Sequence, residues 1–123
     1  MSRIDRINEL MKREIGKMIL LGEVEDPRIQ FVTIQSVVVS KDLQHARVKF
    51  SILSDKPEDI KNAQEGLDKC RSHIRKLVGQ RVKIRYTPEI QFYYDKSVQY
   101  TAQIERVLEE IKKLKSGDDN DKN

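Results

Sequence analysis

The chain has 123 residues, of which 37% are hydrophobic and 36% are charged, and 24 lysines and arginines against 20 acidic residues give a formal net charge of +4. This length is typical of one domain with its own hydrophobic core. No apolar run approaches the roughly 18 residues that a membrane span needs, and the N-terminus lacks the apolar stretch of a signal peptide. A single cysteine can form no internal disulfide and cannot by itself hold a structural zinc. We therefore expect a cytoplasmic protein that does not contact a membrane.

Residues 2–21 are predicted to form an amphipathic helix. Ser2 can cap its N-terminus, with Asp5 completing an acidic variant of the capping box, and Gly22 is a stop signal. Apolar residues recur at helical spacing and should form the buried stripe of this helix. They are Ile4, Ile7, Met11, Ile15, Met18 and Ile19.

Two strands are predicted over residues 31–40 and 44–53, after a loop over residues 23–30 that contains Pro27. The first strand should place Val32, Ile34 and Val38 on one face. In the second strand an apolar face should alternate with a partly basic outer face. The apolar positions are Ala46, Val48, Phe50 and Ile52, and the outer positions are Arg47, Lys49, Ser51 and Leu53. The connection is short enough for a hairpin, so we expect the two strands to be antiparallel.

A second helix is predicted over residues 57–78, because Pro57 suits a first helical turn and Gly79 can end the helix. Its apolar stripe consists of Ile60, Ala63, Leu67, Cys70, Ile74 and Leu77. A third strand is predicted over residues 82–94, with a bulge or a sheet edge at Pro88. Its two faces should carry Val82, Ile84 and Tyr86 on one side and Lys83 and Arg85 on the other.

A last helix should begin at Asp95 or Ser97 and carry a further amphipathic stripe. The stripe consists of Ile104, Val107, Leu108, Ile111 and Leu114. Residues 116–123 hold three aspartates and one lysine, so without them the chain carries +6. The element order predicts an α+β domain with a three-stranded sheet over residues 1–115, followed by a disordered acidic tail over 116–123.

Catalytic chemistry finds little support in the sequence. His45 and His73 lie on different predicted elements without metal-ligand spacing, and we interpret both as surface side chains. Cys70 falls on an apolar stripe, where a buried thiol is a poor nucleophile. The five glycines are scattered, so no phosphate-binding loop is formed. We therefore expect neither an enzyme nor a cofactor or metal site.

The clearest functional signal is a basic run without acids. Residues 71–87 contain six basic residues and no acidic one, namely Arg71, Arg75, Lys76, Arg81, Lys83 and Arg85. Phosphate contacts dominate nucleic-acid affinity, so this run predicts contact with RNA or DNA. The paired aromatic residues of a base-stacking sheet are missing, which favours recognition of backbone and shape over base sequence. Tyr93 and Tyr100 could stack on bases, although we interpret them as tyrosines at the edge of the core.

Two further basic groups could extend this surface. Arg47 and Lys49 lie on the outer face of their strand, and Arg3, Arg6, Arg13 and Lys17 share one face of the first helix. In that helix Asp5, Glu9 and Glu14 interleave with the basic residues. Pairing within the helix therefore remains an alternative to nucleic-acid contact there.

Several short motifs, in their order and spacing over about residues 2–112, resemble the ribosome-binding factor A family. They are Asp26-Pro27-Arg28-Ile29, Val32-Thr33-Ile34, Val37-Val38-Val39-Ser40, Asp42-Leu43 with Ala46, Ile74-Arg75-Lys76-Leu77-Val78-Gly79, Pro88-Glu89-Ile90 and Phe92-Tyr93-Tyr94-Asp95. The resemblance implies a type II KH-like domain, in the order α-β-β-(α-α)-β-α with a three-stranded sheet. It also implies a break in the middle helix at Cys70, Arg71 and Ser72, where the family has an Ala-x-Gly element that this sequence lacks.

The resemblance implies a ribosome assembly factor. Such a protein binds the free 30S small subunit near the 5′ region of its 16S rRNA, assists late maturation and matters most in the cold; it is not an enzyme. We expect a monomer without a small-molecule substrate. The residues chosen by charge for RNA binding are Arg3, Arg6, Arg13, Arg47, Lys49, Arg71, Arg75, Lys76, Arg81, Lys83 and Arg85. The alternative is a protein-interaction module whose basic face docks an acidic partner, with a nuclease as a distant third.

Overall fold

The computed structural model describes residues 1–97 and 105–114 of the chain. Its elements are α1 (Arg3–Leu20), the short 3-10 helix η1 (Pro27–Ile29), β1 (Thr33–Val39), β2 (His45–Ser51), α2 (Pro57–Arg81) and β3 (Glu89–Tyr94). Residues 105–114 are also helical. The predicted tail over 116–123 and the predicted positions of Tyr100 and Ile104 lie outside the described residues.

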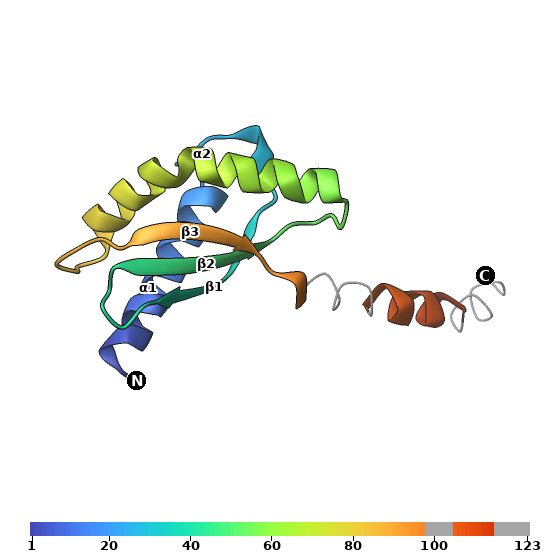
Figure 1. The fold of residues 1–123 in the computed structure, drawn as a ribbon. Helices are drawn as coiled ribbons and strands as arrows, with labels where there is room; N and C mark the ends of the chain where they lie inside the picture. The colour runs from blue at the N-terminus through green and yellow to red at the C-terminus, as the bar shows by residue number, and fades with distance from the viewer. Residues whose placement is uncertain (98–104, 115–123) are drawn as a thin grey trace.

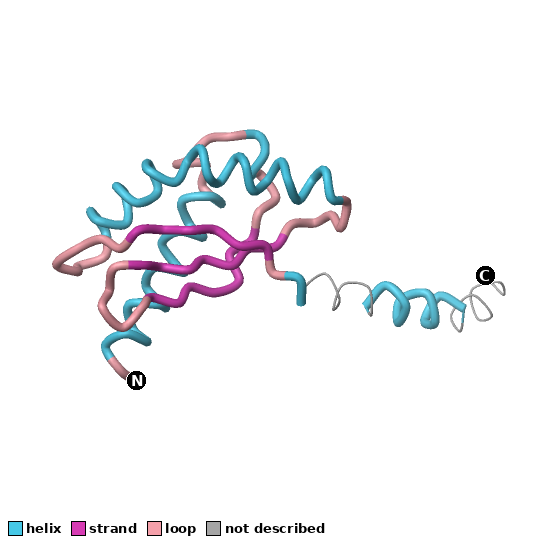
Figure 2. Tube along the Cα trace, in the orientation of Figure 1, coloured by secondary structure: helices cyan, strands magenta, loops and turns pink. Residues whose placement is uncertain are grey.

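The three strands form one mixed sheet in the order β1-β2-β3 (Figures 1 and 2). β1 and β2 are antiparallel, as the short hairpin predicts, whereas β2 and β3 are parallel and are joined through α2. A parallel pair needs such a crossover, because its strands run in the same direction. α1 packs against β1 and α2 packs against β3. The α+β class with a three-stranded sheet is therefore confirmed.

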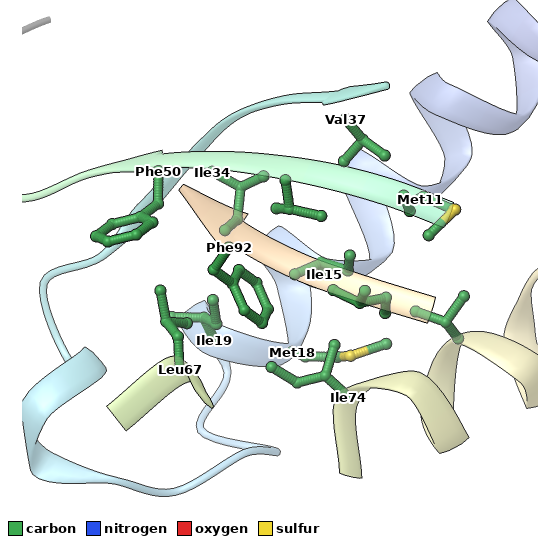
Figure 3. Packing of buried hydrophobic residues seen from close by; sticks show 14 of the residues in the cluster. Met11, Ile15, Met18, Ile19, Ile34, Val37, Phe50, Leu67, Ile74 and Phe92 are labelled. Atoms are coloured by element: carbon green, nitrogen blue, oxygen red, sulfur yellow. The ribbon is translucent and has the colours of Figure 1, made fainter. Parts of the chain in front are cut away.

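One core joins both helices to the inner face of the sheet. Figure 3 shows Met11 and Met18 of α1, Ile74 of α2 and Phe92 of β3 in this core, and all four side chains are buried. Alternate residues of the strands, such as Arg47, are exposed on the opposite face. The sheet thus has one covered face and one open face.

α1 forms as the sequence predicts. Ser2 Oγ accepts a hydrogen bond from the backbone N–H of Asp5 at 3.1 Å, and Asp5 Oδ2 accepts from the backbone N–H of Ser2 at 3.3 Å. This reciprocal pair is the predicted capping box. The helix ends just before Gly22, whose φ of +71° is a backbone conformation that glycine adopts without strain. The predicted stripe is buried except at its first member, Ile4, which is half-buried.

The predicted inner face of β1 is wrong at Val38. The pairing register with β2 shifts between Ile34 and Ser36, and this β-bulge reverses the alternation that follows. Val37 and Val39 are therefore buried, and Val38 is 55% exposed. Ser51 was also expected on the outer face, yet it is 6% exposed and its hydroxyl accepts a hydrogen bond from Gln35 Nε2 at 2.7 Å.

α2 is longer and more regular than expected. It runs without interruption from Pro57 to Arg81, so the break that the resemblance implies at Cys70, Arg71 and Ser72 is absent. Neither cysteine nor serine has glycine's freedom at positive φ, and both remain in helical conformation. The helix also passes through Gly79, which was predicted to end it. A Cβ atom at Gly79 would lie 2.7 Å from Thr87 Oγ1, so the glycine serves close packing instead.

The third strand begins seven residues later than predicted, at Glu89. Residues 82–88 form a loop, here called the 82–88 loop, which contains a tight turn closed by Ile84 N–H and the Val82 carbonyl at 2.9 Å. Pro88 has no N–H to donate, and the pairing with β2 begins where Glu89 N–H donates to the Gln44 carbonyl at 2.8 Å. Lys83, Arg85 and Tyr86 therefore lie on a loop and not on a strand face.

The described part of the predicted last helix lies beyond the sheet (Figure 1). Asp95 Oδ1 accepts a hydrogen bond from the backbone N–H of Ser97 at 3.0 Å, as a helix cap does. In residues 105–114 the apolar stripe is exposed, and Arg106 Nη2 lies 2.7 Å from Asp55 Oδ2. Within the described ranges, no helix is both long and apolar enough to cross a membrane.

Candidate nucleic-acid interface

A basic hollow of about 490 Å³ lies between the C-terminal half of α2 and the 82–88 loop. It is called the α2 hollow below. Its charged and aromatic lining consists of Arg71, Arg75, Lys76, Arg85, Tyr86 and Glu89. The fold thus brings together four of the six residues of the predicted basic run, from two elements. This juxtaposition follows from the packing of Gly79 against Thr87, which draws the loop onto the helix.

Arg75 holds the 82–88 loop in place. Its Nη2 donates to the Thr87 carbonyl at 2.8 Å and its Nε donates to the Pro88 carbonyl at 3.2 Å. Its Nη1 also lies 3.5 Å from Glu89 Oε1. Most of the guanidinium is therefore engaged within the protein, and Arg75 acts mainly as a positioning residue.

The other basic residues of the α2 hollow are free to meet an anion. Arg71, Lys76 and Arg85 are exposed, as is Lys83 on the neighbouring part of the loop. Among residues 1–97 and 105–114, no carboxylate lies within salt-bridge distance of these four side chains. The hollow therefore presents uncompensated positive charge to solvent, which is what phosphate recognition requires.

Arg81 does not line the α2 hollow. Its guanidinium donates to Glu23 Oε2 at 2.5 Å and links the end of α2 to the segment after α1. The hydrogen bond to Glu23 raises the pKa of Arg81 above its ordinary value. In this structure Arg81 is a partly exposed structural contact, although the sequence placed it at the centre of the basic surface.

The basic face of α1 borders a second hollow, of about 680 Å³, between α1 and β1. It is called the α1 hollow below. Arg6, Arg13 and Lys17 line it as one face, as predicted, together with Lys12. Glu14 lies 3.6 Å from Arg13 and 3.9 Å from Lys17. The pairing within the helix that the sequence left open is therefore present.

Arg47 and Lys49 lie on the open face of the sheet. The Arg47 guanidinium carbon is 4.8 Å from the centroid of the Tyr93 ring, and the Tyr93 hydroxyl donates to Gln91 Oε1 at 2.6 Å. Tyr93 was interpreted as a tyrosine at the edge of the core, but it is 37% exposed on this face. The pairing of Lys49 with Tyr93 in the β2–β3 register explains its position.

The predicted basic residues therefore occupy three surfaces, not one. The strand order places the α1 hollow at the β1 side of the sheet and the α2 hollow at the β3 side, with Arg47 and Lys49 on the open face. Two of the basic residues of α1 nevertheless lie at the same end of the sheet as the 82–88 loop. Val39 N–H donates to Asn8 Oδ1 at 2.9 Å, and Glu89 N–H donates to the Gln44 carbonyl. The first turns of α1, which carry Arg3 and Arg6, thus share one end of the sheet with the 82–88 loop (Figure 1).

Tyr86 is the residue of this region that sequence reasoning missed. The predicted strand grouped it with Val82 and Ile84, yet it is 70% exposed on the loop and lines the α2 hollow. The Arg85 guanidinium carbon is 5.4 Å from its ring centroid. The signal that could have found it is Pro88, because a proline two residues on argues against a paired strand at Tyr86.

The candidate catalytic groups do not assemble. His45 and His73 are exposed on different elements, and burial raises the pKa of the Cys70 thiol. Within the described part of the chain, no group of three histidine, cysteine, aspartate or glutamate side chains could hold a metal ion. The arrangement offers positive charge and an exposed aromatic ring, which suit binding of nucleic acid.

Comparisons with known proteins find similar sequences and a similar fold. A sequence profile described as ribosome-binding factor A matches residues 3–108. The ribosome-binding factor A of Halothermothrix orenii is 47% identical over 116 residues, which cover 94% of this chain and 93% of that protein. The crystal structure of ribosome-binding factor A from Thermus thermophilus matches with a TM-score of 0.65 at 22% identity, covering 76% of this chain and 97% of that one.

A homology model of the Thermus thermophilus ribosome binding factor A, fitted into the cryo-EM map of its complex with the 30S subunit, matches with a TM-score of 0.57. Its identity is 23%, and the match covers 71% of this chain and 89% of that one. Both structural likenesses support the fold that the helices and the sheet define.

Proposed function

The chain belongs to the ribosome-binding factor A family, and on that premise we propose that it binds the free 30S small subunit through the 5′ region of 16S rRNA. It then assists a late step of small-subunit maturation and matters most in the cold. One of the similar proteins, from Thermus thermophilus, has been fitted into a map of its complex with the 30S subunit. The observation that carries the proposal is the α2 hollow. Four exposed basic residues in and beside it have no neutralising carboxylate among the described residues.

The mechanism we propose is binding without catalysis. A protein that binds one conformation of rRNA better than another shifts the population toward that conformation, by no more than the difference in affinity. Misfolded RNA helices persist longer in the cold, so such a binder would be needed most there. The chain would act as a cytoplasmic monomer, with no cofactor and no small-molecule substrate.

The phosphate contacts would come from Arg71, Lys76, Lys83 and Arg85, with Arg75 holding the loop in place. Arg3 and Arg6, at the same end of the sheet, would extend this surface. Contacts of this kind fix a protein on the RNA backbone and release counterions, so binding should weaken steeply with salt.

Sucrose-gradient sedimentation of a lysate, with the protein detected by antibody, tests this function. We expect the wild-type chain to migrate with free small subunits and to be absent from translating ribosomes. The Arg71→Glu, Lys76→Glu, Arg85→Glu variant should remain at the top of the gradient. A matched control reverses three exposed lysines away from the α2 hollow, Lys56→Glu, Lys61→Glu and Lys96→Glu, and should still migrate with the subunit.

Two outcomes would contradict the proposal. A wild-type signal only at the top of the gradient would reject the small subunit as partner. Subunit binding together with unmeasurable RNA affinity at low salt would favour the alternative, a basic module that docks an acidic protein.

A further inference from the structure

The α2 hollow contains more than positive charge, because Tyr86 exposes most of its ring beside it. The side chain is 70% exposed, and the Arg85 guanidinium carbon lies 5.4 Å from the centroid of its ring. A large aromatic ring in water is a ready stacking surface for another π system. An isolated exposed tyrosine would need no explanation, but this one borders a group of cations.

The loop that carries Tyr86 is anchored to α2 directly after the tyrosine. The two residues after it are fixed by Arg75, which donates to the carbonyls of Thr87 and Pro88 at 2.8 and 3.2 Å. Pro88 is fully buried, and Thr87 packs where Gly79 leaves room for it. The backbone that follows the ring is thus anchored before any ligand binds, which limits the conformational entropy lost on binding.

The hollow has the size and the charge distribution for one nucleotide. Its volume of about 490 Å³ falls within the range of roughly 300–1,000 Å³ that small-ligand sites occupy. Arg71 and Lys76 approach from the helix side, whereas Arg85 and Tyr86 lie on the loop and Glu89, at the start of β3, pairs with Arg75. A nucleotide offers a partner to both sides, since its phosphates are anionic and its base is a flat ring that can stack on a tyrosine.

We propose that the α2 hollow binds one unpaired nucleotide of RNA, with its base stacked on Tyr86 and its flanking phosphates against Arg71 and Lys76. This inference rests on the proposed function and adds a ligand class to it. In a duplex both faces of each base are covered by neighbours, so an exposed tyrosine can stack only on a base that is splayed out of the helix. The site would therefore select RNA with an unpaired base at the point of contact.

The test compares variants of the full chain on three probes: a short single-stranded RNA, the same RNA annealed to its complement, and heparin, a polyanion without bases. Tyr86→Ala should weaken single-strand affinity by roughly 5- to 150-fold, the effect of losing one base–aromatic stack. Affinity for the duplex and for heparin should not change. The log–log salt dependence should also keep its slope, because no charge has been removed.

Two further variants separate stacking from other effects. Tyr86→Phe keeps the ring and should bind like the wild type, and Tyr93→Ala removes an exposed tyrosine of the open sheet face and should have little effect. The chain has no tryptophan, so Tyr86→Trp gives a single indole whose fluorescence single-stranded RNA should quench. This readout does not depend on how well Tyr86→Ala folds.

The results distinguish this inference from the proposed function. If the wild type binds the single strand with a steep salt dependence but Tyr86→Ala binds equally well, the nucleotide site is wrong and the proposed function stands. Equal losses for RNA and heparin, or equal losses for Tyr86→Phe and Tyr86→Ala, would also reject stacking. If the wild type binds no RNA even at low salt, both proposals fail.

Discussion

The two basic hollows of this protein carry similar numbers of cations but differ in what surrounds them. In the α1 hollow, Glu9 belongs to the lining and Glu14 pairs with Arg13 and Lys17 along the helix. In the α2 hollow, the one carboxylate of the lining is Glu89, which pairs with Arg75. The placement of carboxylates, more than the count of basic residues, therefore decides where a polyanion can bind.

Charge reversal should give the largest difference in RNA affinity between variants of the two hollows. Arg71→Glu, Lys76→Glu and Arg85→Glu together should weaken RNA affinity by about 100-fold or more, because bonds to charged groups contribute roughly 1.5–3 kcal/mol each before solvent screening. Arg6→Glu, Arg13→Glu and Lys17→Glu together should weaken RNA affinity by less than about tenfold, because Glu14 already neutralises part of the charge of Arg13 and Lys17 and only Arg6 lies at the edge of the RNA surface. Fluorescence anisotropy with labelled RNA measures both.

Circular dichroism provides the folding control for this comparison. All six side chains are exposed to solvent, so both triple variants should keep the wild-type spectrum. Equal losses of affinity in two folded variants would mean that total charge, and not the α2 hollow, determines binding.

A substitution at Arg75 tests whether the position of the 82–88 loop matters when the charge of the α2 hollow is unchanged. Arg75→Lys keeps the charge but cannot bridge the Thr87 and Pro88 carbonyls, since an ammonium lacks the planar fork of a guanidinium. We expect about 1 kcal/mol less stability, because the side chain is still 43% exposed. The amides of the 82–88 loop should exchange faster with solvent, and RNA affinity should fall several-fold. An unchanged exchange rate at the loop would show that Arg75 does not hold it.

Two helical glycines extend the comparison to packing. A Cβ atom at Gly16 of α1 would have no neighbour within 4 Å, so Gly16→Ala should stabilise the fold by about 1 kcal/mol in urea unfolding. Gly79→Ala should increase the stability clearly less than Gly16→Ala does, because the new methyl group would meet Thr87 Oγ1 at 2.7 Å.

A double variant identifies the cause of that difference. In a Thr87→Ala background the obstructing hydroxyl is gone, so Gly79→Ala should recover most of the gain seen at Gly16. Equal gains for both glycines in the wild-type background would contradict the close packing of the loop on α2.

The smallest expected effect distinguishes Arg81 from Lys83. Arg81→Ala should lower stability slightly, because Glu23 loses its ion-pair partner and such partly exposed pairs contribute little. Lys83→Ala should leave stability unchanged and weaken RNA affinity slightly. Urea midpoints and RNA titrations measure both, and the reverse pattern would exchange the structural and binding roles of the two residues.

The elements that the sequence predicted well are those governed by local signals. The capping box at Ser2 and Asp5, the helical spacing of Met11 and Ile15, and the alternation in β2 as far as Phe50 depend on neighbours along the chain. The errors depend on contacts between distant segments. The exposure of Val38 follows from a bulge against β2, and the presence of a glycine inside α2 at position 79 is explained by the room that Thr87 needs.

The same division holds for the candidate site. The acid-free run over residues 71–87 is visible in the sequence, and it coincides with the α2 hollow, where the charge is uncompensated. The sequence does not show which residues of this run are exposed cations and which are engaged within the protein. Arg75 positions the loop through the Pro88 carbonyl, and Arg81 pairs with Glu23, so both roles depend on residues of other segments. Tyr86 was assigned to the wrong environment because its strand was predicted too long.

The salt dependence of RNA affinity locates the phosphate contacts most directly, when the wild type is compared with the Arg71→Glu, Lys76→Glu, Arg85→Glu variant. Each phosphate contact on single-stranded RNA contributes about −0.7 to the slope of log affinity against log salt. If the α2 hollow makes the phosphate contacts, the slope of the variant should be shallower by about 2, the sum for three contacts. A variant slope equal to that of the wild type would show that the contacts lie elsewhere on the protein.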